Sequence, residues 1–146
     1  MRLVAVLVFV GATSAAAAPV DTLFQEFGLF GTWALDCKQP ATPANPHVSI
    51  TTPSPGLVRE EHDLGPNYTV NRYSMLSAER VSPDELSAEV IFQPGTETEE
   101  RQKLVFRVRK DTRRTMFNQP DNGAVRVKDG IVLARGAKTP VLEKCE

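Results

Sequence analysis

The chain has 146 residues with a formal net charge of −1 at pH 7, and 41% of its residues are hydrophobic. This length suits one globular domain, and the near-neutral charge argues against a dedicated nucleic-acid binder. The hydrophobic content is too high for a disordered chain, while eleven prolines and nine glycines favour turns over long helices.

The N-terminus has the three-part layout of a secretory signal peptide. Arg2 provides a positive start, Leu3–Val10 is an uninterrupted apolar run, and small residues follow. Ala15 and Ala17 match the two small positions that a signal peptidase reads, so we expect residues 1–17 to be removed. The apolar run is shorter than the roughly 20 residues of a membrane-spanning helix. We therefore expect no transmembrane segment in the mature chain and a periplasmic or secreted location.

Two cysteines, Cys37 and Cys145, stand near the two ends of the mature chain. In an oxidising compartment two thiols of a small domain usually pair. A zinc site would need further ligands, and no histidine cluster stands near either cysteine. We predict a disulfide between them that ties the first strand to the last, as expected when a sheet closes on itself.

The mature chain, residues 18–146, is expected to be a single β domain preceded by a short helix. The helix is expected at Asp21–Phe27, because Leu23 and Phe24 share a side and Gly28 ends it. Strands are expected, from alternation and from the turn residues between them, at residues 32–37, 47–51, 57–63, 68–81, 88–92, 103–109, 113–118, 124–128, 131–135 and 139–144.

The turns favour neighbouring antiparallel strands. Asn122-Gly123 and Asp129-Gly130 are hairpin signals because each glycine tolerates a positive φ. Strands and helices do not alternate, and no internal repeat is present. The sequence predicts an all-β fold, a closed antiparallel barrel of about eight or nine short strands with a short N-terminal helix. A two-sheet β-sandwich is the alternative.

Gly31-Thr32-Trp33 resembles the Gly-x-Trp that opens the first strand of lipocalin-like (calycin-type) barrels. In that family the tryptophan packs at the closed end of the barrel beneath a basic residue from the last strands. The resemblance implies that Arg135 takes this part here. A late cysteine bridged to an earlier one is also common in that family. The chain is similar, too, to small disulfide-bonded bacterial barrels that inhibit metalloproteases and lysozymes through their termini or loops.

Charged residues gather on the strand expected at residues 57–63. Glu60 and His62 share one face of this strand, and a metal site could combine them with His47. Such a site needs three or four converging ligands. None of the familiar motifs for hydrolysis, zinc binding or phosphate binding is present. We therefore expect a solvated edge strand, with no metal, no cofactor and no catalytic residue.

A basic stretch crosses the two strands expected at residues 103–109 and 113–118. Its candidate partner-binding residues are Arg107, Arg109, Arg113 and Arg114. If the strands form a hairpin, this patch faces solvent and could meet an anionic glycan, a lipid headgroup or an acidic protein. A solvated outer face balanced by nearby glutamates is the simpler interpretation.

The residues expected inside the barrel are bulky enough to fill it. They are Trp33, Leu35, Val90, Phe92, Leu104, Phe106 and Val108. We therefore expect an exported binding or inhibitor-type protein without catalytic activity, with an unknown protein or glycan partner. The helix and the loops Lys38–Pro46 and Pro94–Glu100 are its candidate contact surfaces. A carrier of small hydrophobic ligands, of lipocalin type, is the alternative and requires an interior cavity. A hydrolase with an unrecognised carboxylate site is the third hypothesis.

Overall fold

The computed structural model describes residues 16–146, so most of the expected signal peptide lies outside the described residues. No helix in this part of the chain has the length and apolar character that a bilayer crossing requires. The elements in chain order are α1 (Val20–Glu26), β1 (Gly31–Ala34), β2 (His47–Ser54), β3 (Leu57–Asp63), β4 (Asn71–Ser82), β5 (Glu85–Phe92), β6 (Glu100–Arg109), β7 (Thr112–Pro120), β8 (Val127–Lys128), β9 (Ile131–Val132), β10 (Ala137–Lys138) and β11 (Leu142–Lys144).

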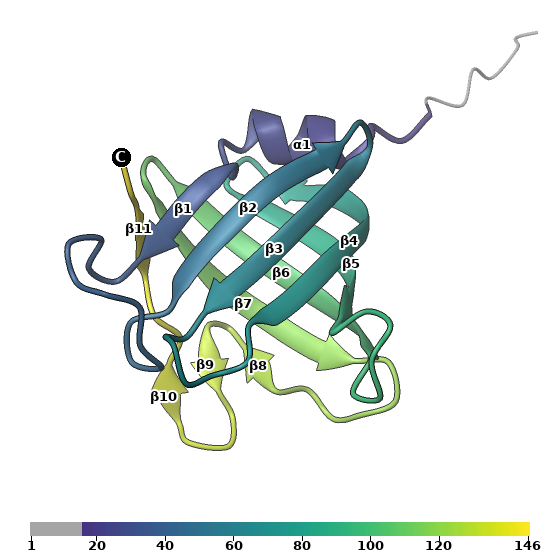
Figure 1. The fold of residues 1–146 in the computed structure, drawn as a ribbon. Helices are drawn as coiled ribbons and strands as arrows, with labels where there is room; N and C mark the ends of the chain where they lie inside the picture. The colour runs from purple at the N-terminus through teal and green to yellow at the C-terminus, as the bar shows by residue number, and fades with distance from the viewer. Residues whose placement is uncertain (1–15) are drawn as a thin grey trace, which may run out of the picture.

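Eight strands close into an antiparallel barrel, and three short strands extend the sheet at one end (Figure 1). The order around the barrel is β7-β11-β1-β2-β3-β4-β5-β6, and pairing of β6 with β7 closes the ring. Strands β8, β9 and β10 continue from β7 outside the ring, and we call residues 127–138 the outer flap. The predicted closed barrel is confirmed, and the sandwich alternative is not observed.

Helix α1 lies across one end of the barrel, opposite the outer flap (Figure 1). Its apolar side is buried, with Phe24 fully enclosed. The Asp21 carboxylate accepts the backbone N–H of Gly56 at 2.8 Å, which ties the helix to the turn between β2 and β3. Trp33 lies in the core at this end, fully buried, and its indole N–H donates to the carbonyl of Leu29 at 2.8 Å. This end of the barrel is therefore closed.

The basic residue over Trp33 is Lys144, not Arg135. The Lys144 ammonium lies 5.3 Å from the centroid of the Trp33 ring and donates to the carbonyl of Gly28 at 2.8 Å. The pairing of β1 with β11 places Trp33 opposite Lys144. Arg135 is exposed, in the turn between β9 and β10. The role expected of Arg135, which is to cover Trp33, therefore belongs to Lys144 on the last barrel strand, β11. Arg135 cannot take it because it follows β9, which lies outside the barrel.

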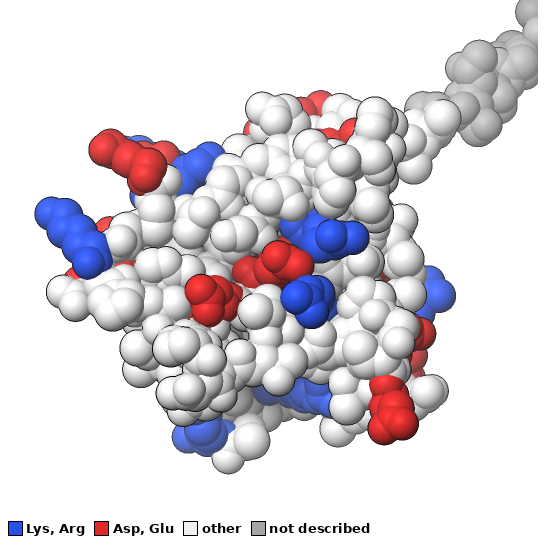
Figure 2. Space-filling model, viewed as in Figure 1, with Lys and Arg blue, Asp and Glu red and all other residues white. Residues whose placement is uncertain are grey.

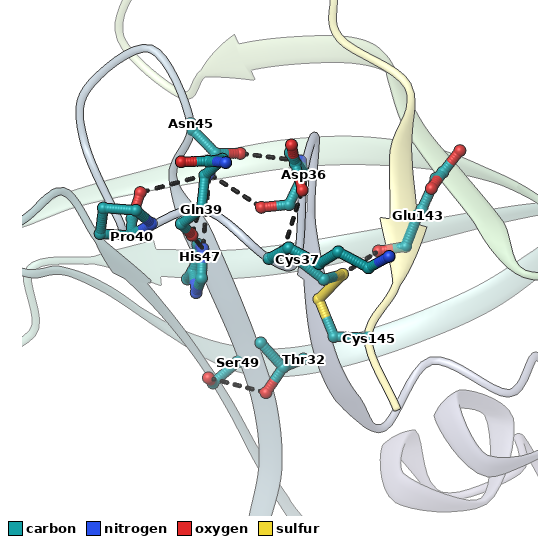
Figure 3. The surroundings of a disulfide bond; sticks show 11 residues. Thr32, Asp36, Cys37, Gln39, Pro40, Asn45, His47, Ser49, Glu143 and Cys145 are labelled. Atoms are coloured by element: carbon teal, nitrogen blue, oxygen red, sulfur yellow. Dashed lines mark hydrogen bonds between the residues drawn. A yellow bond between two sulfur atoms is a disulfide. The ribbon is translucent and has the colours of Figure 1, made fainter.

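The predicted disulfide between Cys37 and Cys145 is confirmed (Figure 3). Its Cα atoms are 5.5 Å apart, across a sequence separation of 108 residues. The backbone N–H of Cys145 donates to the carbonyl of Thr32 at 2.8 Å, which continues the β1–β11 pairing up to the bridge. The covalent link therefore reinforces the two shortest strands of the barrel wall.

The loop after Cys37 is held together by one asparagine (Figure 3). The Asn45 amide donates to the carbonyls of Asp36 and Pro40 at 3.0 and 3.3 Å. Its oxygen accepts the backbone N–H of Asp36 at 3.0 Å. Beside it, the His47 ring contacts the carbonyl of Gln39 at 2.9 Å. These contacts fix a proline-rich loop that contains no regular element other than an isolated bridge.

Two local expectations need correction. Leu35 was expected inside, but its exposed fraction is 43%, because β1 ends at Ala34 and the chain bends away.

Asp129 and Gly130 have φ of 52° and 70°, so the predicted tight turn between β8 and β9 is confirmed. At Asn122-Gly123, by contrast, a longer connection leads from β7 to β8, and Gly123 does not adopt a positive φ.

Candidate functional site

The barrel contains a cavity of about 390 Å³ in the half away from helix α1. Apolar side chains from five strands line it, namely Val48, Phe92, Leu104, Phe106, Val127 and Leu142. Polar and charged groups share the same space, namely Glu60, His62, Tyr73, Gln102, Arg113, Arg114, Asn118 and Arg126. The expected filling of the barrel by bulky residues is therefore wrong, since Phe92, Leu104 and Phe106 line the empty space instead of filling it.

Two different segments lie beside β7 on the side away from β6. Strand β11 has three residues and meets β7 through only two residue pairs, Leu142 with Arg113 and Glu143 with Thr112. Further along β7 the outer flap lies on that side, where Asn118 pairs with Val127 and the backbone N–H of Gly130 donates to the carbonyl of Met116 at 2.9 Å. Thr139 and Pro140, between the flap and β11, contribute to the cavity lining. The short strands that the disulfide reinforces thus border the cavity.

An ion pair joins opposite walls inside the barrel. The Glu60 carboxylate on β3 accepts two hydrogen bonds from the Arg113 guanidinium on β7, at 3.0 and 3.2 Å. The His62 ring lies 2.6 Å from the same carboxylate, which is 2% exposed. The prediction that Glu60 and His62 share a face is confirmed, but that face is the interior, so the solvated edge strand is wrong. The apolar Val58, two residues earlier and also buried, was the signal that this face points inward.

The environment of Glu60 keeps it ionised. Burial alone would raise the pKa of Glu60, but the charge of Arg113 and the hydrogen bond from His62 outweigh it and lower that pKa to about 2. Arg113 is itself 4% exposed and packs over the ring of Phe106, 4.6 Å from its centroid. Two buried charges therefore compensate each other and stiffen the cavity wall.

Three rings on neighbouring strands form a continuous aromatic wall. Tyr73 lies between His62 and Phe92, with ring centroids 5.0 Å away on each side. All three rings line the cavity and are only partly buried, because they face the empty space. Burial raises the pKa of the Tyr73 phenol, and the nearby Glu60 charge adds to this. Tyr73 is therefore a neutral phenol at any physiological pH. Of this wall, only Phe92 was expected inside the barrel.

A polar chain leads along the wall from β6 and β7 toward the solvent. The Asn118 amide donates to Gln102 at 2.8 Å, and the Gln102 amide donates to Glu100 at 2.6 Å. Arg126 closes the chain with two bonds to Glu100, at 2.7 and 2.8 Å. The hydrogen bond from Arg126 lowers the pKa of Glu100. The side-chain oxygen of Asn118 is enclosed and has no hydrogen-bond partner among residues 16–146.

The four arginines of the expected basic patch do not form one surface. Arg113 points into the barrel, as described above. Arg107 and Arg109 lie on the outer face and pair with Glu85 at 2.6 Å and Asp84 at 2.7 Å. The hydrogen bond from Arg109 also lowers the pKa of Asp84. On the face that Figure 2 shows, charges of both signs are interspersed.

Arg114 lies between β7 and the outer flap. Its guanidinium donates to Thr139 at 3.0 Å and to the carbonyl of Gly130 at 2.6 Å. It also lines the cavity. The alternation of residues along β7 separates it from Arg113, because neighbouring side chains in a strand point to opposite faces.

Within residues 16–146, no group of three or more His, Cys, Asp or Glu side chains is arranged to hold a metal ion. His47, the third ligand considered above, contacts the loop carbonyl of Gln39. Glu60 and His62 belong to the ion-pair cluster instead.

Comparison with known protein families, curated proteins and solved structures finds no match to the chain. The eight-stranded closed barrel is consistent with the calycin-like architecture that Gly31-Thr32-Trp33 implied. The class defined by the fold and the site is a disulfide-bonded antiparallel barrel, closed at one end by a helix and containing a cavity in the other half.

Proposed function

We propose that this protein binds a small, mainly apolar molecule inside its barrel and does not transform it. The observation that carries the proposal is the cavity of about 390 Å³, with apolar walls and a few fixed polar groups. Ligand sites in proteins have this composition, and their volumes span roughly 300–1,000 Å³. The cavity lies at the lower end of that range, which favours a compact ligand.

Binding without catalysis agrees with the state of the buried charges. Glu60 is the carboxylate inside the cavity, and both of its oxygens are already engaged by Arg113 and His62. A general base needs a pKa near the working pH, whereas the pKa of Glu60 is lowered to about 2. The cluster therefore acts as a rigid part of the wall.

A carrier accounts for the cavity better than the inhibitor-type function that the sequence alone favours. Helix α1, a candidate contact surface, buries Leu23 and Phe24 against the barrel. The loop Lys38–Pro46 is held by Asn45 in a fixed conformation. These features leave little adaptable apolar surface for a protein partner at either site, and the loop Pro94–Glu100 alone stays open to that role.

The proposal includes export of the protein to the periplasm or the cell exterior. The disulfide is compatible with an oxidising compartment. The N-terminal segment expected to be a signal peptide supports the same location. A carrier there would move a poorly soluble molecule through an aqueous compartment.

The test is binding of a neutral fluorescent probe, N-phenyl-1-naphthylamine, to the disulfide-bonded protein. We expect saturable fluorescence enhancement that Leu104→Trp abolishes, because Leu104 lines the cavity and a larger side chain fills it. Val105→Trp is the matched control, since Val105 is the next residue of β6 and lies on the outer face. No binding by the wild type, or equal loss in both variants, would refute a ligand site in the barrel.

A further inference from the structure

We propose that the ligand of this cavity is a neutral aromatic carbonyl compound whose oxygen accepts a hydrogen bond from the Tyr73 hydroxyl. This inference rests on the proposed function, because it assigns a chemical class to the molecule bound in the barrel. It follows from the place of Tyr73 in the wall, from the unused donor of its hydroxyl and from the charges around it.

Tyr73 faces the interior of the barrel. The register of the sheet places it directly opposite Glu60 on β3 and directly opposite Phe92 on β5. Residues directly opposite on neighbouring antiparallel strands share one face of the sheet. Glu60 is buried inside the barrel and Phe92 lines the cavity, so the shared face is the inner one. Tyr73 itself lines the cavity, as the middle ring of the aromatic wall.

The hydroxyl of Tyr73 lies among the charged groups of the interior. Burial is the largest cause of its raised pKa, and the charges of Glu60 and Arg113 act on it next. Glu60 belongs to β3 and Arg113 to β7, which are opposite walls of the barrel. The hydroxyl therefore lies in the space between these walls, where a ligand would be bound.

This hydroxyl is an unused hydrogen-bond donor. Among residues 16–146 it has no hydrogen-bond partner. The side-chain oxygen of Asn118 also lacks one, but that oxygen is enclosed, whereas the Tyr73 hydroxyl is not. The raised pKa keeps the proton on the Tyr73 oxygen. Because the lone pairs of a phenol are partly delocalised into the ring, it donates better than it accepts. The ligand group that fits is therefore an acceptor such as a carbonyl oxygen.

The charges around Tyr73 favour a ligand without a charge. Glu60 is paired with Arg113 at 3.0 Å, and Glu100 is paired with Arg126 at 2.7 Å. An ionic group beside Tyr73 would lose its water without meeting an unpaired counter-charge, and such burial is costly. A carbonyl oxygen carries only a partial charge and needs one donor, which Tyr73 supplies.

The aromatic wall selects the rest of the ligand. The Tyr73 ring lies between those of His62 and Phe92, with centroids 5.0 Å away on each side. Aromatic rings favour offset or tilted contact with other rings beyond the area they bury. An aromatic ring conjugated to a carbonyl group is flat, so its body can lie against this wall while its oxygen meets the hydroxyl of Tyr73.

The test compares 2-acetylnaphthalene with 2-isopropenylnaphthalene, in which a methylene group replaces the carbonyl oxygen. Titration calorimetry on the disulfide-bonded protein gives the ratio of the two dissociation constants. A hydrogen bond between neutral groups is worth about two- to tenfold in affinity. Tyr73→Phe should therefore shift the ratio against the ketone by this factor and leave the affinity for the alkene nearly unchanged. Retained binding of the alkene shows that the cavity of the variant is intact.

A spectroscopic signature reports the hydrogen bond itself. A hydrogen bond to a ketone moves the carbon-13 resonance of its carbonyl carbon downfield. In carbonyl-labelled 2-acetylnaphthalene, the resonance of the bound ketone should lie further downfield in the wild type than in Tyr73→Phe. A role of Tyr73 in packing alone would leave this resonance in place.

Tyr68→Phe is the matched control. Tyr68 is the other tyrosine of the chain, is 57% exposed and is not part of the cavity lining. This variant removes the same atom outside the barrel, so the ratio of dissociation constants and the carbonyl resonance should match those of the wild type.

The outcomes separate this inference from the proposed function. The same ratio in the wild type and Tyr73→Phe, or binding of N-phenyl-1-naphthylamine without binding of 2-acetylnaphthalene, would overturn the inference and leave the carrier in place. Tighter binding of the anion 2-naphthoate than of 2-acetylnaphthalene would overturn it too, by excluding the neutral class. No binding of either naphthalene probe, together with no binding of N-phenyl-1-naphthylamine, would overturn the proposed function itself.

Discussion

The buried pair of Glu60 and Arg113 predicts a specific dependence of stability on pH. Glu60 has an ordinary pKa of 4.5 when the chain is unfolded and a pKa of about 2 in the folded protein. A carboxylate whose pKa is lowered by folding stabilises the protein fully above the unfolded value. The contribution is lost as the pH falls from about 4.5 through about 2. Acid should therefore lower the free energy of unfolding by protonating the buried Glu60 carboxylate, in addition to carboxylates at the surface.

The expected magnitude follows from the two pKa values. One pKa unit corresponds to about 1.4 kcal/mol, so the difference between 4.5 and about 2 amounts to about 3 kcal/mol in the free energy of unfolding. Urea titrations at a series of pH values measure it, with fluorescence of Trp33 as the signal. Trp33 is the only tryptophan and is fully buried, so its emission reports unfolding directly.

Glu60→Gln should flatten this dependence. Its loss of stability between about pH 5 and pH 2 should be smaller than that of the wild type by about 3 kcal/mol. Glu61→Gln is the matched control, because Glu61 is the next residue, is 40% exposed and pairs with Arg72 at 3.0 Å outside the barrel. This exposed pair should contribute at most about 1 kcal/mol. The same acid sensitivity in the wild type and Glu60→Gln would refute the buried ion pair.

The remaining predictions concern the wall of the barrel. Replacing Cys37 and Cys145 by serine should lower the free energy of unfolding by about 4–5 kcal/mol on the chain-entropy model, because the bridge closes a loop of 108 residues; an unchanged urea midpoint would contradict this. A double-mutant cycle of Lys144→Met with Trp33→Phe should give a coupling of about 0.5–2 kcal/mol from the ammonium over the indole, and zero coupling would remove that contact from the account. Gly130→Val should cost about 1 kcal/mol or more, since its φ of 70° suits glycine, as the shift of the thermal midpoint would show.

The sequence by itself determined the class of fold and the covalent frame. Alternation along the strands from His47 to Asn118 and the Asp129-Gly130 turn predicted antiparallel pairing, because these signals are local. Cys37 and Cys145 could be paired because no other cysteine competes. Burial of Trp33 followed from its place in the first strand.

Only the tertiary structure decided which charged residues face the interior. Arg113 and Arg114 are neighbours of the same type, and the pairing of β7 with β11 determines which of them points inside. Glu60 belongs to a charged strand segment, yet it is buried because Arg113, 53 residues later, faces it across the barrel. A buried charge needs a partner, and that partner is found only when the chain has closed. The cavity depends on the same closure, since its lining comes from strands as far apart in the sequence as β2 and β11.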